Sequence, residues 1–418
     1  MVITIINFHF KGGNFMHQAR QIIDDIYYIG ASDRRLNLFE NIHPVPDGMS
    51  YNSYVVLDEK TVLLDTVDKA ISKVFLENLD AVLNGRKLDY IVINHMEPDH
   101  TATLAEVFFR HPEATLVGNT KTFSMMKQFF DMPIDGHTLV VKEGDTLNTG
   151  KHTFSFHLAS MVHWPEVMVT FDTTYKALFS ADAFGTFGAL NGNIFSDEFN
   201  FETEWLSEAR RYYTNIVGKY GVQTQALLKK AAPLDVAYLC PLHGPAWRDK
   251  EKIAWFIDKY SKWSSYTPED NDVVIFYGSI YGNTEDAANF LANELGKKGV
   301  RNIKVFDVST KDPSYLIGEA FRAKVFVFAC STYNAEIFPK MEDFLLELKG
   351  HNMQNRDVAI LENGSWALLA GKKIKEILST MKNINLIGDS IAIKSALKEE
   401  QLSSIEKMAE DIKEALEK

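Results

Sequence analysis

Strand and helix patterns alternate without interruption from Asp272 to the end of the chain. Short apolar runs with the length of buried strands occur at residues 273–277, 302–307, 324–330, 357–361 and 385–387. Amphipathic helical patterns follow them at residues 284–295, 315–321, 339–348, 372–381 and 399–416. Such alternation predicts a doubly wound α/β domain, in which helices cover both faces of a parallel sheet.

The chain before this region has a different pattern, with short β-rich runs that do not alternate regularly with helices. The runs are at residues 26–29, 53–57, 61–65, 90–94, 115–117, 137–141, 152–158, 167–172 and 177–180, and helical spacing is found at 69–83, 102–110, 121–130, 202–217 and 222–231. We expect a mixed α+β domain here. An acidic segment with one proline, residues 266–272, predicts the boundary between a first domain at 16–267 and a second at 268–418. Patterned sequence begins only after Met16, so residues 1–15 are predicted to be an N-terminal extension.

Charge and cysteine content narrow the classes of function. Lys and Arg number 44 and Asp and Glu 56, a net charge of −12, which argues against nucleic acid or an anionic membrane as partner. No apolar run reaches the ~18 residues of a membrane-spanning helix. The 2 cysteines, Cys240 and Cys330, provide neither a disulfide framework nor a four-thiolate metal site, and they suit the reducing cytoplasm.

The densest group of metal-competent side chains is His95-Met96-Glu97-Pro98-Asp99-His100, directly after the strand predicted at 90–94. A polar surface turn is the alternative interpretation. Four such side chains within one short loop at a strand end favour metal binding.

Three later residues are candidates to complete this site. His163, Asp182 and His243 each follow an apolar strand and precede a turn. A single histidine in that position is usually a satisfied polar residue. Together with the first loop, however, they supply enough imidazoles and carboxylates for two metals, provided that one carboxylate bridges them.

Three loops of the second domain predict a flavin site. The first, Gly278-Ser279-Ile280-Tyr281-Gly282-Asn283-Thr284, joins a strand to a helix, so its hydroxyls and N–H groups suit the phosphate of FMN. It has neither the lysine of a nucleotide-triphosphate loop nor a dinucleotide fingerprint. The others are Ser331-Thr332-Tyr333-Asn334-Ala335 and Asn363-Gly364-Ser365-Trp366. All three follow parallel strands, where open α/β sheets bind ligands. Tyr333 and Trp366 either flank the flavin ring or are ordinary half-buried aromatics.

The order His-x-Glu-x-Asp-His, then His, Asp and His, resembles the flavodiiron proteins over residues 20–418. The resemblance implies an αββα metallo-β-lactamase-like sandwich followed by a flavodoxin-like domain. It implies that one iron is bound by His95, Glu97 and His163, the other by Asp99, His100 and His243, and that Asp182 bridges them. Zinc hydrolases of this fold carry histidine where this chain has Glu97, and a carboxylate favours iron.

The resemblance also implies an activity and its partners. Family members reduce dioxygen to water or nitric oxide to nitrous oxide. The di-iron pair stores two electrons and reduced FMN two more; one dioxygen takes all four to form two waters, whereas two nitric oxides take two electrons and two protons to form nitrous oxide and one water. A separate rubredoxin-like protein or a flavin reductase would be the electron donor. A head-to-tail homodimer would place the FMN of one subunit beside the irons of the other.

Several residues near the predicted metal site have two interpretations, and two other functions fit the same motifs. Phe184, Phe187 and Leu190 either wall the site or are plain core, and Glu40 stands where many relatives carry a histidine. One rival is a zinc hydrolase fused to a flavodoxin-like module. The other is an FMN electron carrier without di-iron catalysis.

Overall fold

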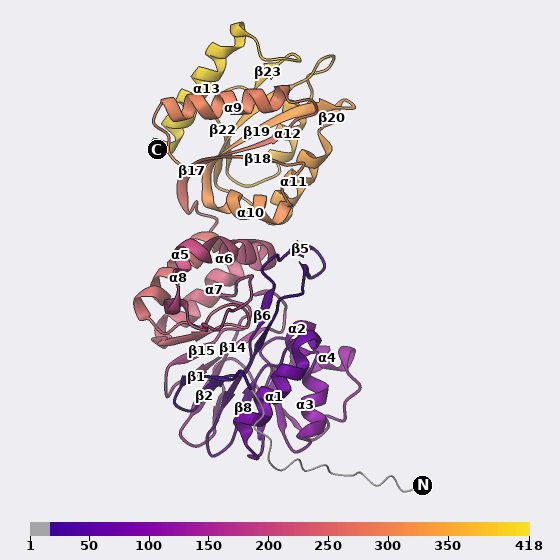
Figure 1. The fold of residues 1–418 in the computed structure, drawn as a ribbon, viewed down its shortest axis with the longest axis vertical. Coiled ribbons are helices and arrows are strands. Elements are labelled where there is room, and N and C mark those ends of the chain that lie inside the picture. Colours follow the sequence, from indigo (N-terminus) through magenta and orange to yellow (C-terminus); the bar gives the residue numbers. More distant parts are fainter. Residues whose placement is uncertain (1–16) are drawn as a thin grey trace.

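The computed structural model describes residues 17–418, so the predicted extension at residues 1–15 lies outside it. The chain forms two lobes stacked along the long axis of the molecule (Figure 1). It passes from the first to the second between helix α8 (Lys250–Ser264) and strand β17 (Asp270–Gly278). None of the helices formed by residues 17–418 is both long and apolar enough to span a membrane.

The first lobe is built on two sheets packed face to face. One sheet has the order β1 (Arg20–Ile23), β2 (Ile26–Tyr28), β7 (Tyr54–Val56), β8 (Val62–Leu64), β9 (Tyr90–Val92), β10 (Thr115–Gly118) and β11 (Thr138–Val140). The other has the order β12 (Thr146–Asn148), β13 (Thr153–Leu158), β14 (Met168–Asp172), β15 (Ala177–Phe179) and β16 (Tyr238–Cys240). Buried side chains of both sheets, such as Val56 and Phe156, share one apolar cluster.

Helices and short hairpins complete this lobe. The first sheet is accompanied by α1 (Ser72–Leu83), α2 (Pro98–Thr101), α3 (Leu104–Arg110) and α4 (Thr120–Phe129). Two small sheets pair β3 (Ala31–Asp33) with β6 (Met49–Tyr51), and β4 (Leu38–Phe39) with β5 (His43–Pro44). The predicted αββα sandwich is therefore confirmed.

The single helix predicted at residues 202–217 is wrong. The chain instead forms α5 (Phe201–Glu204), α6 (Leu206–Tyr212), a π-helical turn (Tyr213–Val217) and a 3-10 turn (Gly218–Tyr220). The separate helix predicted at 222–231 is confirmed as α7 (Gly221–Ala231). The wider π turn begins between Tyr212 and Tyr213, which are consecutive and both fully buried. Helix α8 was not predicted, although Ile253, Phe256, Tyr260 and Trp263 recur at helical spacing.

The second lobe is a sheet of parallel strands in the order β18 (Ile303–Asp307), β17, β19 (Ala323–Tyr333), β21 (Arg356–Asn363) and β22 (Ile384–Leu386). Strand β23 (Ile391–Ile393) also pairs with β21, and β20 (Glu336–Ile337) folds back on β19. The helices are α9 (Asn283–Lys297), α10 (Pro313–Arg322), α11 (Pro339–Gly350), α12 (Ala370–Leu378) and α13 (Glu399–Glu417). This strand order is that of flavodoxin, which confirms the predicted doubly wound sheet.

Candidate functional site

The seven predicted metal ligands come together at the loops that follow strands of the first lobe. His95 and Glu97 follow β9, and Asp99 and His100 lie on α2. The remaining ligands stand in loops after β13, β15 and β16: His163, Asp182 and His243. Their donor atoms form two groups, each with members within 4.8 Å of one another, the first of His95, Glu97, His163 and Asp182 and the second of Asp99, His100 and His243. Six of the seven side chains are buried and Asp99 is half-buried.

The two oxygens of Asp182 face different groups. Its Oδ2 lies 3.1 Å from His163 Nε2 and 3.4 Å from His95 Nε2. Its Oδ1 lies 3.0 Å from His100 Nε2 and 3.7 Å from His243 Nε2. This arrangement suits a carboxylate that bridges two cations.

Buried atoms without hydrogen-bond partners show that this donor set fits metal ions. Both oxygens of Asp99, Oδ1 of Asp182, both ring nitrogens of His100 and Nε2 of His243 are buried and make no hydrogen bond. Buried polar atoms are nearly always satisfied, so such a concentration needs a partner of another kind. Imidazole and carboxylate donors at this spacing suit iron, zinc or manganese ions.

Two outer contacts orient the imidazoles toward the site. His95 Nδ1 donates to Glu166 Oε1 at 2.8 Å, and the Met96 N–H donates to the same oxygen at 2.8 Å. His243 Nδ1 donates to the Ser50 carbonyl at 2.7 Å. Each contact leaves Nε2 free for a metal, which is the usual role of such partners. Glu166 was not predicted from the sequence, although it is an acid only three residues after His163.

Charge in the site is balanced between carboxylates and imidazoles. Burial alone would lower the pKa of His163, but hydrogen bonds with Asp182 and Glu97 outweigh it and raise that pKa to about 9. Burial would raise the pKa of Glu97, but hydrogen bonds from His163 and His95 lower it below its usual range. These acids therefore stay ionised, and binding of a cation would displace protons from the imidazoles.

Glu40 lies close to this site. The residue has φ 49° and its Oε2 lies 3.8 Å from His43 Nε2. Burial, and then the negative charge of Glu97, raise the pKa of Glu40 to about 8. Its carboxyl group is therefore near the ligands.

Three apolar residues were expected either to wall the site or to be plain core. Phe187 packs on Phe39 and Tyr212 with ring centroids 5.7 and 5.2 Å apart, and both of those rings lie 5.5 Å from the His243 ring. Phe184 packs on Tyr260 at 4.3 Å. Leu190 belongs to the cluster between the two sheets. Only Phe187 is thus linked to a ligand through its ring neighbours.

The three flavin loops surround one cavity of about 240 Å³ at the carboxyl ends of the strands of the second lobe. Eleven of the predicted residues line it together with Ser395, and these eleven are Ser279, Ile280, Tyr281, Asn283, Thr284, Ser331, Thr332, Asn363, Gly364, Ser365 and Trp366. Gly282, with φ 94°, caps α9. Tyr333, Asn334 and Ala335 are not in this lining, and Ser395 was not predicted.

Polar groups in this cavity bond to one another. The Thr284 and Ser331 hydroxyls are 2.7 Å apart, and Asn363 Nδ2 donates to Thr284 Oγ1 at 3.2 Å. Trp366 and Tyr281 are 77% and 92% exposed at the rim. A phosphate ester can take over the hydroxyl donors at the N-terminus of α9, and a flat aromatic ring can lie against the exposed side chains.

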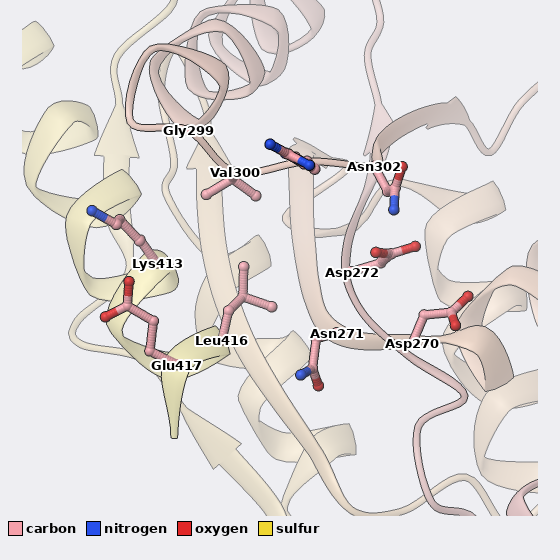
Figure 2. Close-up of a pocket in the computed structure, with 10 residues that line it drawn as sticks. Asp270, Asn271, Asp272, Gly299, Val300, Asn302, Lys413, Leu416 and Glu417 are labelled. Atoms are coloured by element: carbon pink, nitrogen blue, oxygen red, sulfur yellow. The ribbon is translucent and has the colours of Figure 1, made fainter.

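A second cavity in this lobe lies at the opposite end of the strands. It measures about 490 Å³, and its lining includes Asp270, Asp272, Asn302 and Lys413. Figure 2 shows these side chains around the start of β17 and the end of α13. It contains no predicted site residue and lies at the amino ends of β17 and β18, so it is unrelated to the flavin loops.

The fold and the site together define a class: a two-domain metalloflavoprotein with a two-metal centre on a metallo-β-lactamase-like domain. Comparison with known families supports this. Residues 49–244 match the ODP family beta lactamase model, and residues 275–400 match the flavodoxin model.

Known relatives match most of this chain. The rubredoxin-oxygen oxidoreductase of Megalodesulfovibrio gigas is 31% identical over 405 residues, 96% of this chain and 98% of that protein. An anaerobic nitric oxide reductase flavorubredoxin of Pectobacterium carotovorum is 31% identical over 83% of this chain and 69% of its own length. The solved structure of rubredoxin oxygen:oxidoreductase from Desulfovibrio gigas superposes with TM-score 0.87 at 29% identity, covering 96% of this chain and 98% of that one. The chain belongs to the flavodiiron protein family.

Proposed function

We propose that this protein reduces dioxygen to water, nitric oxide to nitrous oxide, or both, at a non-haem di-iron centre that receives electrons from FMN. The observation that carries the proposal is the position of Asp182, whose two oxygens face two separate groups of donors. The names of the relatives, an oxygen oxidoreductase and a nitric oxide reductase, support the same reaction class.

In this proposal His95, Glu97 and His163 hold one iron, Asp99, His100 and His243 hold the other, and Asp182 bridges them. Ferrous ions bound there supply two electrons and reduced FMN two more. Glu166 and Ser50 keep His95 and His243 in the orientation that points Nε2 at the metals. Glu97 makes the first group harder and more anionic than three imidazoles would, which favours iron over zinc.

FMN is proposed to bind in the cavity of the second lobe. The contacting residues would be Ser279, Ile280, Tyr281, Gly282, Asn283, Thr284, Ser331, Thr332, Tyr333, Asn334, Ala335, Asn363, Gly364, Ser365 and Trp366. The cluster of hydroxyls at the start of α9 suits the phosphate. The exposed ring of Trp366 suits the isoalloxazine.

A head-to-tail homodimer and an external electron donor complete the proposal. Figure 1 places β20 and β23, which pair with the ends of β19 and β21, in the part of the second lobe that lies away from the first. Flavin and metals of one chain would therefore be separated, and a second copy would bring them together. We propose a separate rubredoxin-like protein or a flavin reductase as donor, because Cys240 and Cys330 lie in different lobes and cannot share a thiolate iron site.

Domain limits and location are also proposals. We place the first domain at 16–267 and the second at 268–418, after an extension at 1–15, and the passage between α8 and β17 supports this boundary. Cys240 and Cys330 are buried free thiols, and two thiols kept reduced suit the cytoplasm.

The proposal is tested by loading and turnover. The purified protein should contain about two irons and one FMN per chain, and after anaerobic reduction it should consume dioxygen or nitric oxide at a gas electrode. Two zincs without iron would favour the hydrolase, and an iron- and FMN-replete sample that consumes neither gas would refute the proposal.

Substitution of a ligand separates the reductase from an electron carrier. Glu97→Ala should lower gas consumption more than about 100-fold, since loss of even an outer partner of a metal ligand typically costs ~10–100-fold. His157→Ala removes a half-buried histidine of β13 outside the site and should leave turnover unchanged. Full gas consumption by Glu97→Ala with FMN bound would instead support a carrier without di-iron catalysis.

A further inference from the structure

An apolar cavity lies in the first lobe between the second sheet and helices α7 and α8. It measures about 250 Å³. Its inner wall consists of the buried side chains Leu178, Phe184, Leu239 and Ile253. The charged residues of the lining, Asp235 and Lys250, pair with each other at 2.8 Å and are both exposed, so they mark its mouth.

Two strands of the second sheet connect the floor of this cavity to the loops that carry metal ligands. Leu178 on β15 and Leu239 on β16 are register partners in the parallel pair. Four residues beyond Leu178 stands Asp182, and four residues beyond Leu239 stands His243. At ~3.3 Å per extended residue, at most about 13 Å of chain separates the cavity floor from these two ligands.

Phe184 connects the cavity wall to the ligand loop. It lies two residues after Asp182 and has φ 68°, a left-handed conformation that is unfavourable for a bulky side chain. Its N–H donates to the Tyr260 hydroxyl at 2.6 Å, and its ring packs on that of Tyr260 at 4.3 Å. These contacts hold the ring at the inner end of the cavity, and strained backbone of this kind is typical of functional loops.

We infer that this cavity binds and admits the apolar diatomic substrate, dioxygen or nitric oxide, on its way to the metal site. The inference rests on the proposed function, because it assigns an occupant by the chemistry of that substrate. A closed apolar cavity of about 150 Å³ lined by Leu, Ile and Phe holds xenon or benzene. The inner wall here is built from the same kinds of side chain, so a small uncharged gas is the favoured occupant.

Xenon is the probe, because it is an inert apolar gas that does not react with the metals. The holoenzyme should bind xenon in this cavity, followed by ¹²⁹Xe NMR. Ala254 is exposed on α8 and lines the cavity, so Ala254→Trp should fill the opening and abolish that binding. Ala226→Trp is the matched control, an exposed alanine on α7 outside the lining. Ala231→Trp fills the cavity from α7 and serves if the first variant does not fold.

Gas kinetics provide the second readout. For Ala254→Trp we expect kcat/KM for dioxygen or nitric oxide to fall about tenfold while kcat at saturating gas is kept, since binding alone is affected. Iron content, FMN content and the anaerobic rate of flavin reduction should match those of Ala226→Trp. Absence of xenon from the cavity, or an unchanged kcat/KM in a variant that has lost xenon, would overturn the inference. A wild-type protein that consumes neither gas would instead refute the proposed function.

Discussion

At the scale of single residues, Glu166 is the side chain on which the geometry of His95 depends. Its Oε1 accepts hydrogen bonds from His95 Nδ1 and from the Met96 N–H, and the residue is 1% exposed. One carboxylate thus fixes both the ring and the backbone of the first ligand loop. Loss of such a partner leaves every ligand in place but lets the ring rotate.

Glu166→Ala should therefore weaken binding of ferrous iron by about 10- to 100-fold. The affinity is measured by competition with a chelator, on protein stripped of metal and reloaded anaerobically. Glu143→Gln, which changes a partly exposed carboxylate bonded to His157, is the control. Equal affinities in both variants would show that Glu166 has no role in holding the metal.

At the scale of elements, the flavin cavity depends on how tightly the loop after β21 turns. A Cβ added at Gly364 would lie 1.8 Å from the Ala367 carbonyl oxygen, which is backbone and cannot move aside alone. The turn from Asn363 to Trp366 therefore requires glycine at this point. Gly296 offers a comparison within the same lobe. It lies near the end of α9, whose N-terminus borders the flavin cavity, and an added Cβ there would meet nothing within 4 Å.

Gly364→Ala should open this turn and weaken FMN binding about tenfold or more, since overpacking typically costs ~1–3 kcal/mol. Quenching of flavin fluorescence on titration of the FMN-free protein measures the dissociation constant. Gly296→Ala should leave it unchanged and slightly raise stability. An unaltered constant in Gly364→Ala would mean that the loop does not contact FMN.

At the scale of the whole molecule, a buried carboxylate joins the two lobes. Glu269 precedes β17 and accepts from Arg210 Nε on α6 at 2.5 Å. It also accepts from Lys259 Nζ at 2.9 Å and from Trp263 Nε1 at 2.8 Å, both on α8. Burial raises the pKa of Glu269, but the charge of Arg210 and these hydrogen bonds outweigh it and lower the pKa to about 2.

This cluster gives stability that depends on pH. Because the pKa of Glu269 falls from an ordinary 4.5 to about 2 on folding, its contribution is complete above pH 4.5 and is lost as the pH falls toward 2. Glu269→Gln should lower the free energy of unfolding at pH 7 by about 3–5 kcal/mol, because Arg210 is left buried without its charge partner. Urea denaturation at several pH values measures this. The exposed Glu347→Gln is the control, and a difference that does not shrink below pH 4.5 would contradict the explanation.

Much of this protein is determined by local sequence. The alternation of strands and helices after Asp272 can be predicted because each element shows its own periodicity within one segment. The ligands from His95 to His100 can be predicted because they are neighbours in the chain. The tertiary structure decided what depends on contacts between distant segments. The segment predicted as one helix forms α5, α6 and a π turn, and the consecutive Tyr212 and Tyr213 are both buried there. The tertiary structure also places Asp182 between two groups of donors and Glu166 within hydrogen-bond distance of His95. Such contacts between distant residues form only when separate strands bring their loops to one edge of the sandwich.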